Sequence, residues 1–119
     1  FSFINLQYGV SNEELIELRN NYGIKIYNFS QINLFQNIDA QAALIDACDV
    51  VVSIANSVAH LSSSLNKNTK VILPKVCDWR WGLNGNKSFW YKNTKLYRQK
   101  DFSNWDYVFK KISDDLKKL

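Results

Sequence analysis

The sequence predicts an α/β fold, a Rossmann-like three-layer sandwich in which a mostly parallel sheet lies between two layers of helices. Short apolar runs alternate along the chain with segments whose apolar residues recur at helical spacing, and the connections between them are short. Such connections between parallel strands are right-handed and cover both faces of the sheet. The chain has 119 residues, of which 46% are hydrophobic, so we expect one domain over residues 1–119.

The first expected strand, residues 1–7, leads into a helix over residues 11–23. Ser11 and Glu14 have the spacing of a capping box, and Gly23 suits the left-handed residue that often ends a helix. The buried stripe expected on this helix consists of Leu15, Ile16, Leu18 and Tyr22.

The middle of the chain continues this alternation. After a second strand in residues 24–29, Asp39 is expected to cap a helix over residues 40–48, whose small side chains would let it lie close to a sheet. Residues 49–54, DVVVSI, predict the third strand. Their apolar run is continuous rather than alternating, which is typical of a strand buried on both faces.

The remaining elements follow the same order. A helix over residues 56–66 is expected before a fourth strand in residues 70–74, and residues 95–99 and 103–119 predict the last strand and the last helix. The buried side of the helix at 56–66 is expected to carry Val58, Leu61 and Leu65. The stripe of the last helix consists of Trp105, Val108, Phe109, Ile112, Leu116 and Leu119.

Charge is distributed unevenly along the chain. The net charge is +4, but residues 1–66 hold two basic and six acidic side chains, whereas residues 67–119 hold thirteen basic and five acidic ones. The segment from Lys67 to Lys100 contains nine Lys or Arg residues and one acidic residue, Asp78. This pattern fits either a lysine-rich solvated surface or an anion site, for the phosphate of a small ligand or for nucleic acid.

Parallel α/β sheets bind ligands beyond the carboxyl ends of their strands, so the loops at these ends are the expected binding loops. The first such loop is Gln7-Tyr8-Gly9, and the other two are residues 55–57 and 74–81. All three are therefore candidates for contact with a ligand.

His60 is the only histidine of the chain, and it lies in the first turn of the helix after the third strand. The helix amides near Asn56 and Ser57 have no intrahelical partner there and carry the positive end of the helix dipole. Such a helix start is suited to an anion, and an imidazole beside it can donate to a phosphate oxygen. A half-buried histidine bonded to a backbone carbonyl is the alternative interpretation.

An aromatic segment, residues 75–94, follows the fourth strand. Its Trp79, Trp81, Trp90 and Tyr91 are expected to hold a long loop on the core. Arg80, between two tryptophans, is suited to donate two parallel hydrogen bonds to a phosphate. Since the chain has no paired carboxylates at metal-ligand spacing, we expect neither a metal nor another cofactor.

These residues resemble the carboxyl-terminal part of heptosyltransferase-like glycosyltransferases, in particular the bacterial group often fused to tetratricopeptide repeats. The similarity covers nearly the whole chain and is looser over residues 27–38. The matching positions are Ala59, His60 and Leu61; Leu73 and Pro74; Asp78, Trp79, Arg80 and Trp81; Trp90 and Tyr91; Arg98 and Gln99; and Trp105. The opening NLQYG also fits the first strand of this domain in the family.

The resemblance implies the second half of a two-domain, GT-B type enzyme that moves a sugar from a nucleotide-sugar donor to an acceptor. The missing amino-terminal half would bind the acceptor and supply the catalytic base, and a tetratricopeptide repeat region is a possible neighbour in the full protein. By resemblance the donor diphosphate is bound at the helix after the third strand, by His60 and the amides near Asn56 and Ser57. Arg80 and the loop of Gln7, Tyr8 and Gly9 are expected to bind the same donor, and Arg80 would stabilise the charge of the departing diphosphate. Where the family has Asp-Thr, this chain has Ala55-Asn56, so a carboxylate is absent.

Two other function classes remain open. The basic second half and the aromatic residues fit a nucleic-acid-binding module, which is less favoured, and a nucleotide-sugar epimerase would have the same architecture. The chain has no apolar stretch of the roughly 20 residues that a membrane span needs and no signal-peptide pattern, so we expect a cytoplasmic protein. It opens directly on a strand pattern and has no methionine, which indicates a piece of a longer protein.

Overall fold

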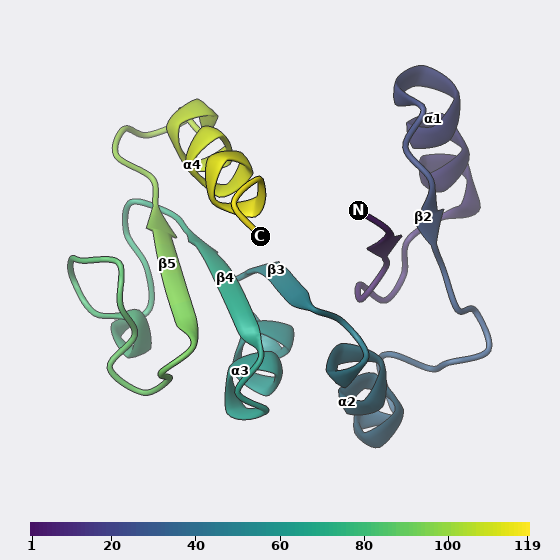
Figure 1. Ribbon diagram of the computed structural model, residues 1–119, viewed down its shortest axis with the longest axis horizontal. Coiled ribbons are helices and arrows are strands. Elements are labelled where there is room, and N and C mark those ends of the chain that lie inside the picture. Colours follow the sequence, from purple (N-terminus) through teal and green to yellow (C-terminus); the bar gives the residue numbers. More distant parts are fainter. The chain divides into compact units, whose positions relative to one another are not determined.

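The computed structural model describes all 119 residues and divides into two compact units, Phe1–Cys48 (unit 1) and Asp49–Leu119 (unit 2), which are described separately. Each unit pairs parallel strands and carries helices (Figure 1). This arrangement confirms the predicted α/β class with parallel strands and is compatible with a Rossmann-like fold. That both units belong to one domain stays a prediction.

Unit 1 contains two short parallel strands, β1 (Phe3–Ile4) and β2 (Ile26–Tyr27), and two helices, α1 (Asn12–Tyr22) and α2 (Ile38–Asp46). The capping box of α1 is present, because the Ser11 side chain accepts from the Glu14 amide and the Glu14 carboxylate accepts from the Ser11 amide. Helix α1 ends at Gly23, whose φ of 67° lies in the left-handed region.

Two expectations for unit 1 are wrong. Leu15 and Leu18 are only half-buried, and Ile16 and Tyr22 are exposed, because a sheet of two short strands offers too little surface to cover this helix. Helix α2 is capped by Asn37 rather than by Asp39, since Asn37 Oδ1 accepts from the Ala40 amide at 2.9 Å. Asp39 instead lies in the first turn, where a negative charge suits the helix dipole.

Unit 2 has a three-stranded parallel sheet in the order β3-β4-β5. Its strands are β3 (Val50–Ile54), β4 (Asn68–Leu73) and β5 (Thr94–Arg98). Helix α3 (Ser57–Ser64) follows β3, the short 3₁₀ turn η1 (Trp79–Trp81) follows β4, and helix α4 (Asp106–Leu116) ends the chain. Every strand and helix expected from the sequence is therefore present, and most of them are shorter than expected.

The two faces of this sheet carry separate clusters of apolar side chains. One cluster joins Ala59 of α3 and Trp81 to the sheet residues Val71, Leu73 and Leu96. The other joins Val108 and Ile112 of α4 to Tyr97 and, at its margin, Ile72. Since neighbouring residues of a strand point to opposite faces, α3 and α4 cover opposite sides of the sheet (Figure 1).

Strand β3 departs from the expected burial on both faces. Val51 is buried, whereas Val52 and Ile54 are 43% and 61% exposed. The strand lies at the edge of its sheet, and within unit 2 helix α4 packs against β5 rather than across to β3. The continuous apolar run therefore does not correspond to a strand covered on both sides by unit 2.

Small hydroxyl side chains hold α3 close to the sheet. Thr69 Oγ1 donates to Ser62 Oγ at 3.1 Å, and Thr94 Oγ1 donates to Ser63 Oγ at 2.8 Å. All four residues are buried. The buried face of α3 therefore consists of Val58, Ala59, Ser62 and Ser63, whereas the expected Leu61 is half-buried and Leu65 is 40% exposed.

The last helix follows its predicted stripe in part. Trp105 and Leu116 are half-buried and Val108 and Ile112 are buried, but Phe109 and Leu119 are 57% and 65% exposed. Phe109 lies outside the strip of α4 that meets the sheet, because a single three-stranded sheet covers only one side of the helix. Leu119 lies beyond the end of the helix at Leu116.

Asp115 ties α4 to the sheet through polar contacts. Its Oδ2 accepts from Lys95 Nζ at 2.5 Å and from the Tyr97 hydroxyl at 2.7 Å, and its Oδ1 lies 3.6 Å from Lys118 Nζ. The hydrogen bonds from Lys95 and Tyr97 lower the pKa of the Asp115 carboxyl well below its usual range. Burial, with the nearby carboxylate, raises the pKa of Tyr97, so the phenol stays protonated.

Asp115→Asn is expected to lower the free energy of unfolding by about 1–2 kcal/mol at pH 7, because it removes a charge-assisted pair. Since the folded-state pKa of Asp115 lies below that of the unfolded chain, this stabilisation is present at neutral pH and is lost as the pH falls through the folded-state value. Urea unfolding of both proteins between pH 7 and pH 2 checks this. The curves should converge in acid, and Asp114→Asn, at an exposed position of the same helix, is the matched control. A difference that persists unchanged in acid would contradict the prediction.

Candidate functional site

The start of α3 is exposed and holds no acidic residue. Asn56 caps the helix, because its Oδ1 accepts from the Ala59 amide at 3.2 Å and from Ser53 Oγ at 3.0 Å. Asn56 and Ser57 are exposed, and the first turn contains no carboxylate. A neutral cap leaves the positive end of the helix dipole uncompensated, so the charge at this helix start suits an anion.

His60 is fixed in orientation by aromatic partners. Its Nδ1 lies 2.9 Å from the hydroxyl of Tyr91, and its ring stacks on Trp81 with 4.6 Å between ring centroids. Trp81 is almost fully buried, so it provides a rigid base for the imidazole. When the Tyr91 hydroxyl donates to Nδ1, a neutral ring has its proton on Nε2, the nitrogen that remains for a ligand. The backbone-carbonyl partner that the alternative interpretation required is not the one observed.

Arg80 lies at the surface, beside Asp78 and over the ring of Trp79. Its guanidinium carbon is 4.7 Å from the centroid of that ring, and its Nη1 donates to both carboxylate oxygens of Asp78 at 2.9 Å. The backbone amide of Arg80, and then its guanidinium, lower the pKa of the Asp78 carboxyl. Asp78 therefore holds Arg80 in place as an ionised partner, and Nε and Nη2 of Arg80 remain for an anion.

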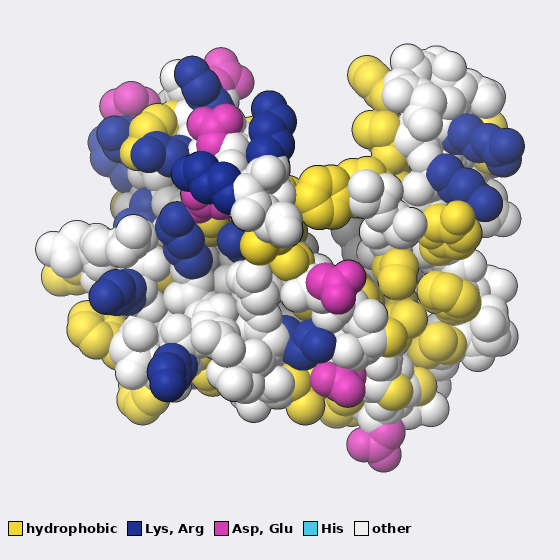
Figure 2. Space-filling view, viewed as in Figure 1, with side chains coloured by type: hydrophobic (Ala, Val, Ile, Leu, Met, Phe, Trp, Pro, Cys, Tyr) yellow, Lys and Arg dark blue, Asp and Glu magenta, His cyan; other side chains and the backbone are white.

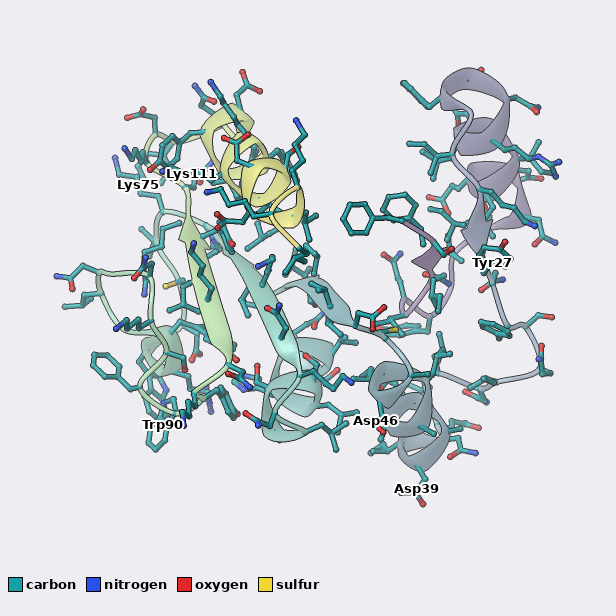
Figure 3. The ribbon with its side chains drawn as sticks, in the orientation of Figure 1. Tyr27, Asp39, Asp46, Lys75, Trp90 and Lys111 are labelled. Atoms are coloured by element: carbon teal, nitrogen blue, oxygen red, sulfur yellow. The ribbon has the colours of Figure 1, made fainter.

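These side chains line one pocket in unit 2. It has a volume of about 270 Å³ and is lined by His60, Trp79, Arg80, Trp90 and Tyr91. Trp90, labelled in Figure 3, lies on the loop between η1 and β5. The pocket thus brings together five residues that were singled out in the sequence, and Trp81 lies beneath His60.

Arg98 organises the loop that carries this pocket, a role that the sequence did not reveal. From the end of β5 its guanidinium donates to backbone carbonyls of the loop and to one thiol. The acceptors are Gly85 O at 2.8 Å, Gly82 O at 3.1 Å, Asn84 O at 3.4 Å, Cys77 Sγ at 3.3 Å and Trp81 O. The following residue, Gln99, accepts from the Lys75 amide at 3.2 Å. Both residues are among the positions that match the family pattern. Their partners are mostly backbone groups, which every residue type has, so the sequence could not predict these contacts.

Gly82 ends η1 at a place where no other residue fits without a shift. Its φ is 71°, and a Cβ at this position would lie 2.7 Å from the ring of Phe89. The turn into the aromatic loop therefore depends on glycine for its backbone angle, whereas the exposed ring of Phe89 could move away from a Cβ.

Gln7, Tyr8 and Gly9 belong to unit 1 and line a different pocket, of about 620 Å³. The pocket of unit 1 follows the carboxyl ends of β1 and β2, as expected for α/β sheets. The pocket of unit 2 instead joins residues that follow β3 and β4 to Trp90 and Tyr91, which precede β5. That Gln7, Tyr8 and Gly9 act on the same ligand as His60 stays a prediction. No three His, Cys, Asp or Glu side chains gather at metal-ligand positions, so no metal centre is described.

Chemically, the pocket of unit 2 combines a guanidinium, an imidazole held in one orientation and three aromatic rings. The two polar groups can donate to phosphate oxygens, and the rings can cover the planar or apolar part of a ligand. The fold and the pocket thus define an α/β protein with an aromatic-walled site suited to an organic anion.

Comparison with known proteins adds one distant relative. The chain is 24% identical over 116 residues to Protein FlbA of Caulobacter vibrioides. These residues make up 97% of the chain, which spans only 19% of the length of FlbA. No protein-family model and no solved structure matches the chain. No helix is long and apolar enough to cross a membrane.

Tyr91→Phe is expected to free the His60 ring without unfolding the protein. The change removes one hydroxyl, so the free energy of unfolding should fall by no more than about 1 kcal/mol. The imidazole should lose its preference for the proton on Nε2, and affinity for a diphosphate should fall about threefold, or ~0.7 kcal/mol. Long-range ¹⁵N spectra of His60 report the tautomer, and Tyr107→Phe is the control. Unchanged tautomer signals would contradict the prediction.

Proposed function

We propose that this chain is the donor-binding half of a glycosyltransferase that moves a sugar from a nucleotide-sugar to an acceptor. The observation that supports this most is the pocket in which His60, Arg80 and three aromatic rings meet beside an α3 start that has no acidic residue. Its polar groups suit a diphosphate, and its aromatic rings suit a flat base attached to it. The resemblance to heptosyltransferase-like enzymes points the same way.

In this proposal each polar group has a defined role. The helix start at Asn56 and Ser57 and the Nε2 of His60 bind the diphosphate, and Arg80 stabilises the negative charge that it gains as the sugar departs. The missing amino-terminal half binds the acceptor and supplies the catalytic base, and a tetratricopeptide repeat region and a cytoplasmic location belong to the same proposal. The positive groups of this chain would serve the leaving diphosphate without a metal ion.

Ligand titration of the chain tests this function. Nucleoside diphosphates and their sugar derivatives should shift the amide signals around residues 56–61 and 78–91, with dissociation constants on the order of 0.1–10 mM because half a cleft leaves much of the ligand in water. The isolated chain should transfer and hydrolyse no donor, whereas the full-length protein should transfer sugar. Turnover by these 119 residues alone would contradict the half-enzyme assignment.

The same titration separates the two alternatives. Lys and Arg side chains gather over β5 and α4 in unit 2 (Figure 2), as a nucleic-acid-binding module would require. Binding to a short oligonucleotide would then fall steeply with salt and be stronger than binding to a nucleotide-sugar. An epimerase would instead convert one nucleotide-sugar into another in an assay of the full-length protein without acceptor.

A further inference from the structure

A second pocket, larger than that of His60 and Arg80, lies within unit 1, at the carboxyl ends of its two parallel strands. It has a volume of about 620 Å³ and is lined by the residues that follow β1, among them Asn5, Gln7 and Tyr8, and by those that follow β2, from Asn28 to Gln36. This is the place where parallel α/β sheets bind ligands, and the volume is in the range of small-molecule sites, about 300–1,000 Å³.

The wall of this pocket contains no charged side chain. Its fourteen lining residues include no Asp, Glu, Lys, Arg or His, but they include six amide side chains. Asn5 is occupied by its own loop, since its Nδ2 donates to Asn28 Oδ1 at 3.0 Å and to Gln7 O at 2.8 Å. The side-chain amide of Gln7 and the Nδ2 of Asn28 are left to bind a ligand, and an amide both donates and accepts.

The helix start beside the pocket is already occupied by a carboxylate. The Glu14 Oε2 accepts from the Ser11 amide at 2.9 Å and lies 3.3 Å from Ser11 Oγ, so the capping box fills the position that a phosphate would take. Glu13 adds a second negative charge in the same turn. Unit 1 as a whole holds five acidic and two basic residues. A phosphate would therefore be repelled here, in contrast to the start of α3.

Two aromatic rings form part of the wall. Tyr8 and Phe35 lie with 5.0 Å between ring centroids at an interplanar angle of 54°, and they are 62% and 67% exposed. Tilted rings do not make the parallel slot that holds a flat base between two faces. The exposed face of one aromatic side chain beside free amides instead suits a ligand ring that has an apolar side and many hydroxyl groups.

We propose that the pocket of unit 1 binds an uncharged sugar ring, with the amides of Gln7 and Asn28 on its hydroxyls and Tyr8 against its apolar side. The sugar is part of either a donor or an acceptor glycan, which present the same chemistry. This site is separate from the pocket of His60 and Arg80, and its binding does not depend on the function proposed for that pocket.

The test is an NMR titration of the ¹⁵N-labelled chain with two probes. Methyl glycosides of glucose, galactose and N-acetylglucosamine are used for the sugar, and inorganic pyrophosphate for the anion. At least one glycoside should shift the amides of residues 5–12 and 28–36, with a dissociation constant on the order of 1–30 mM, as few contacts are made. Pyrophosphate should leave these amides unshifted.

Two variants locate the binding. Gln7→Leu removes an amide that has no partner in the protein, and Tyr8→Ala removes an exposed ring, so both should fold. Each should weaken glycoside binding at least fivefold, whereas Tyr22→Ala, an exposed tyrosine outside the pocket, should not. If a uridine or guanosine diphosphate sugar shifts the same amides as its glycoside, the sugar belongs to a donor, whereas shifts with the glycoside alone identify an acceptor glycan.

Three results would overturn this proposal. They are the absence of any shift in unit 1 with all three glycosides, shifts there with pyrophosphate, and glycoside binding that is the same in Gln7→Leu, Tyr8→Ala and the unaltered chain. Because pyrophosphate shifts around residues 56–61 are recorded in the same samples, failure of the sugar site and failure of the proposed nucleotide site are seen separately.

Discussion

Arg98→Lys is expected to lower the free energy of unfolding of the chain by about 2–4 kcal/mol, because Arg98 reaches four backbone carbonyls and the Cys77 thiol from one guanidinium. The lysine ammonium is a point charge with three donors and cannot span acceptors spread over residues 77–85. The loop that carries Trp81 would lose its attachment to β5. Diphosphate binding in unit 2 should then disappear at millimolar ligand.

Urea unfolding and pyrophosphate titration of the same samples check this expectation. Arg19→Lys, the same replacement at an exposed position of α1, is the matched control and should change neither quantity. If Arg98→Lys unfolds within about 0.5 kcal/mol of the unaltered chain, the carbonyl contacts do not stabilise the loop, and the account of how the pocket is built is wrong.

The second large effect is expected at Arg80, where shape should matter as much as charge. Arg80→Lys retains the positive charge but loses the stacking on Trp79 and the fork of donors. Both Arg80→Lys and Arg80→Ala should therefore weaken diphosphate binding by about tenfold, or ~1.4 kcal/mol. Since Arg80 is about half exposed, neither change should alter the free energy of unfolding much.

Isothermal titration with pyrophosphate and with a nucleoside diphosphate measures this. Lys87→Ala, in the same loop but outside the pocket, controls for a general loss of positive charge. Full affinity in Arg80→Lys would show that Arg80 acts only as one member of a diffuse basic surface. That outcome would strengthen the nucleic-acid alternative.

The fold could be predicted well where local signals decide it. Alternating apolar runs placed every strand and helix, and the spacing of Ser11 and Glu14 gave a capping box that the structure contains. Burial was predicted less well, because it depends on what a residue meets across space. Ile16 and Val52 lie in apolar patterns but are 56% and 43% exposed, since their own unit covers them only in part.

For the candidate site as well, the sequence predicted the residues but not the contacts between them. His60 and Arg80 could be singled out from their neighbours in sequence, and the structure places them around one pocket. The contact that orients His60 and those that hold the aromatic loop could not be predicted, because Tyr91 lies 31 positions from His60 and Arg98 donates to backbone carbonyls. Such partners depend on the path of a loop, and no periodicity in the sequence records that path.

We propose that the pocket of unit 2 binds a nucleotide-sugar through its diphosphate. Isothermal titration of the chain and of His60→Ala with uridine, guanosine and adenosine diphosphate sugars tests it most directly. At least one should bind with a dissociation constant on the order of 0.1–10 mM, and His60→Ala should weaken it about tenfold, or ~1.4 kcal/mol. Equal affinity in both proteins, or no binding of any of these ligands, would contradict the claim.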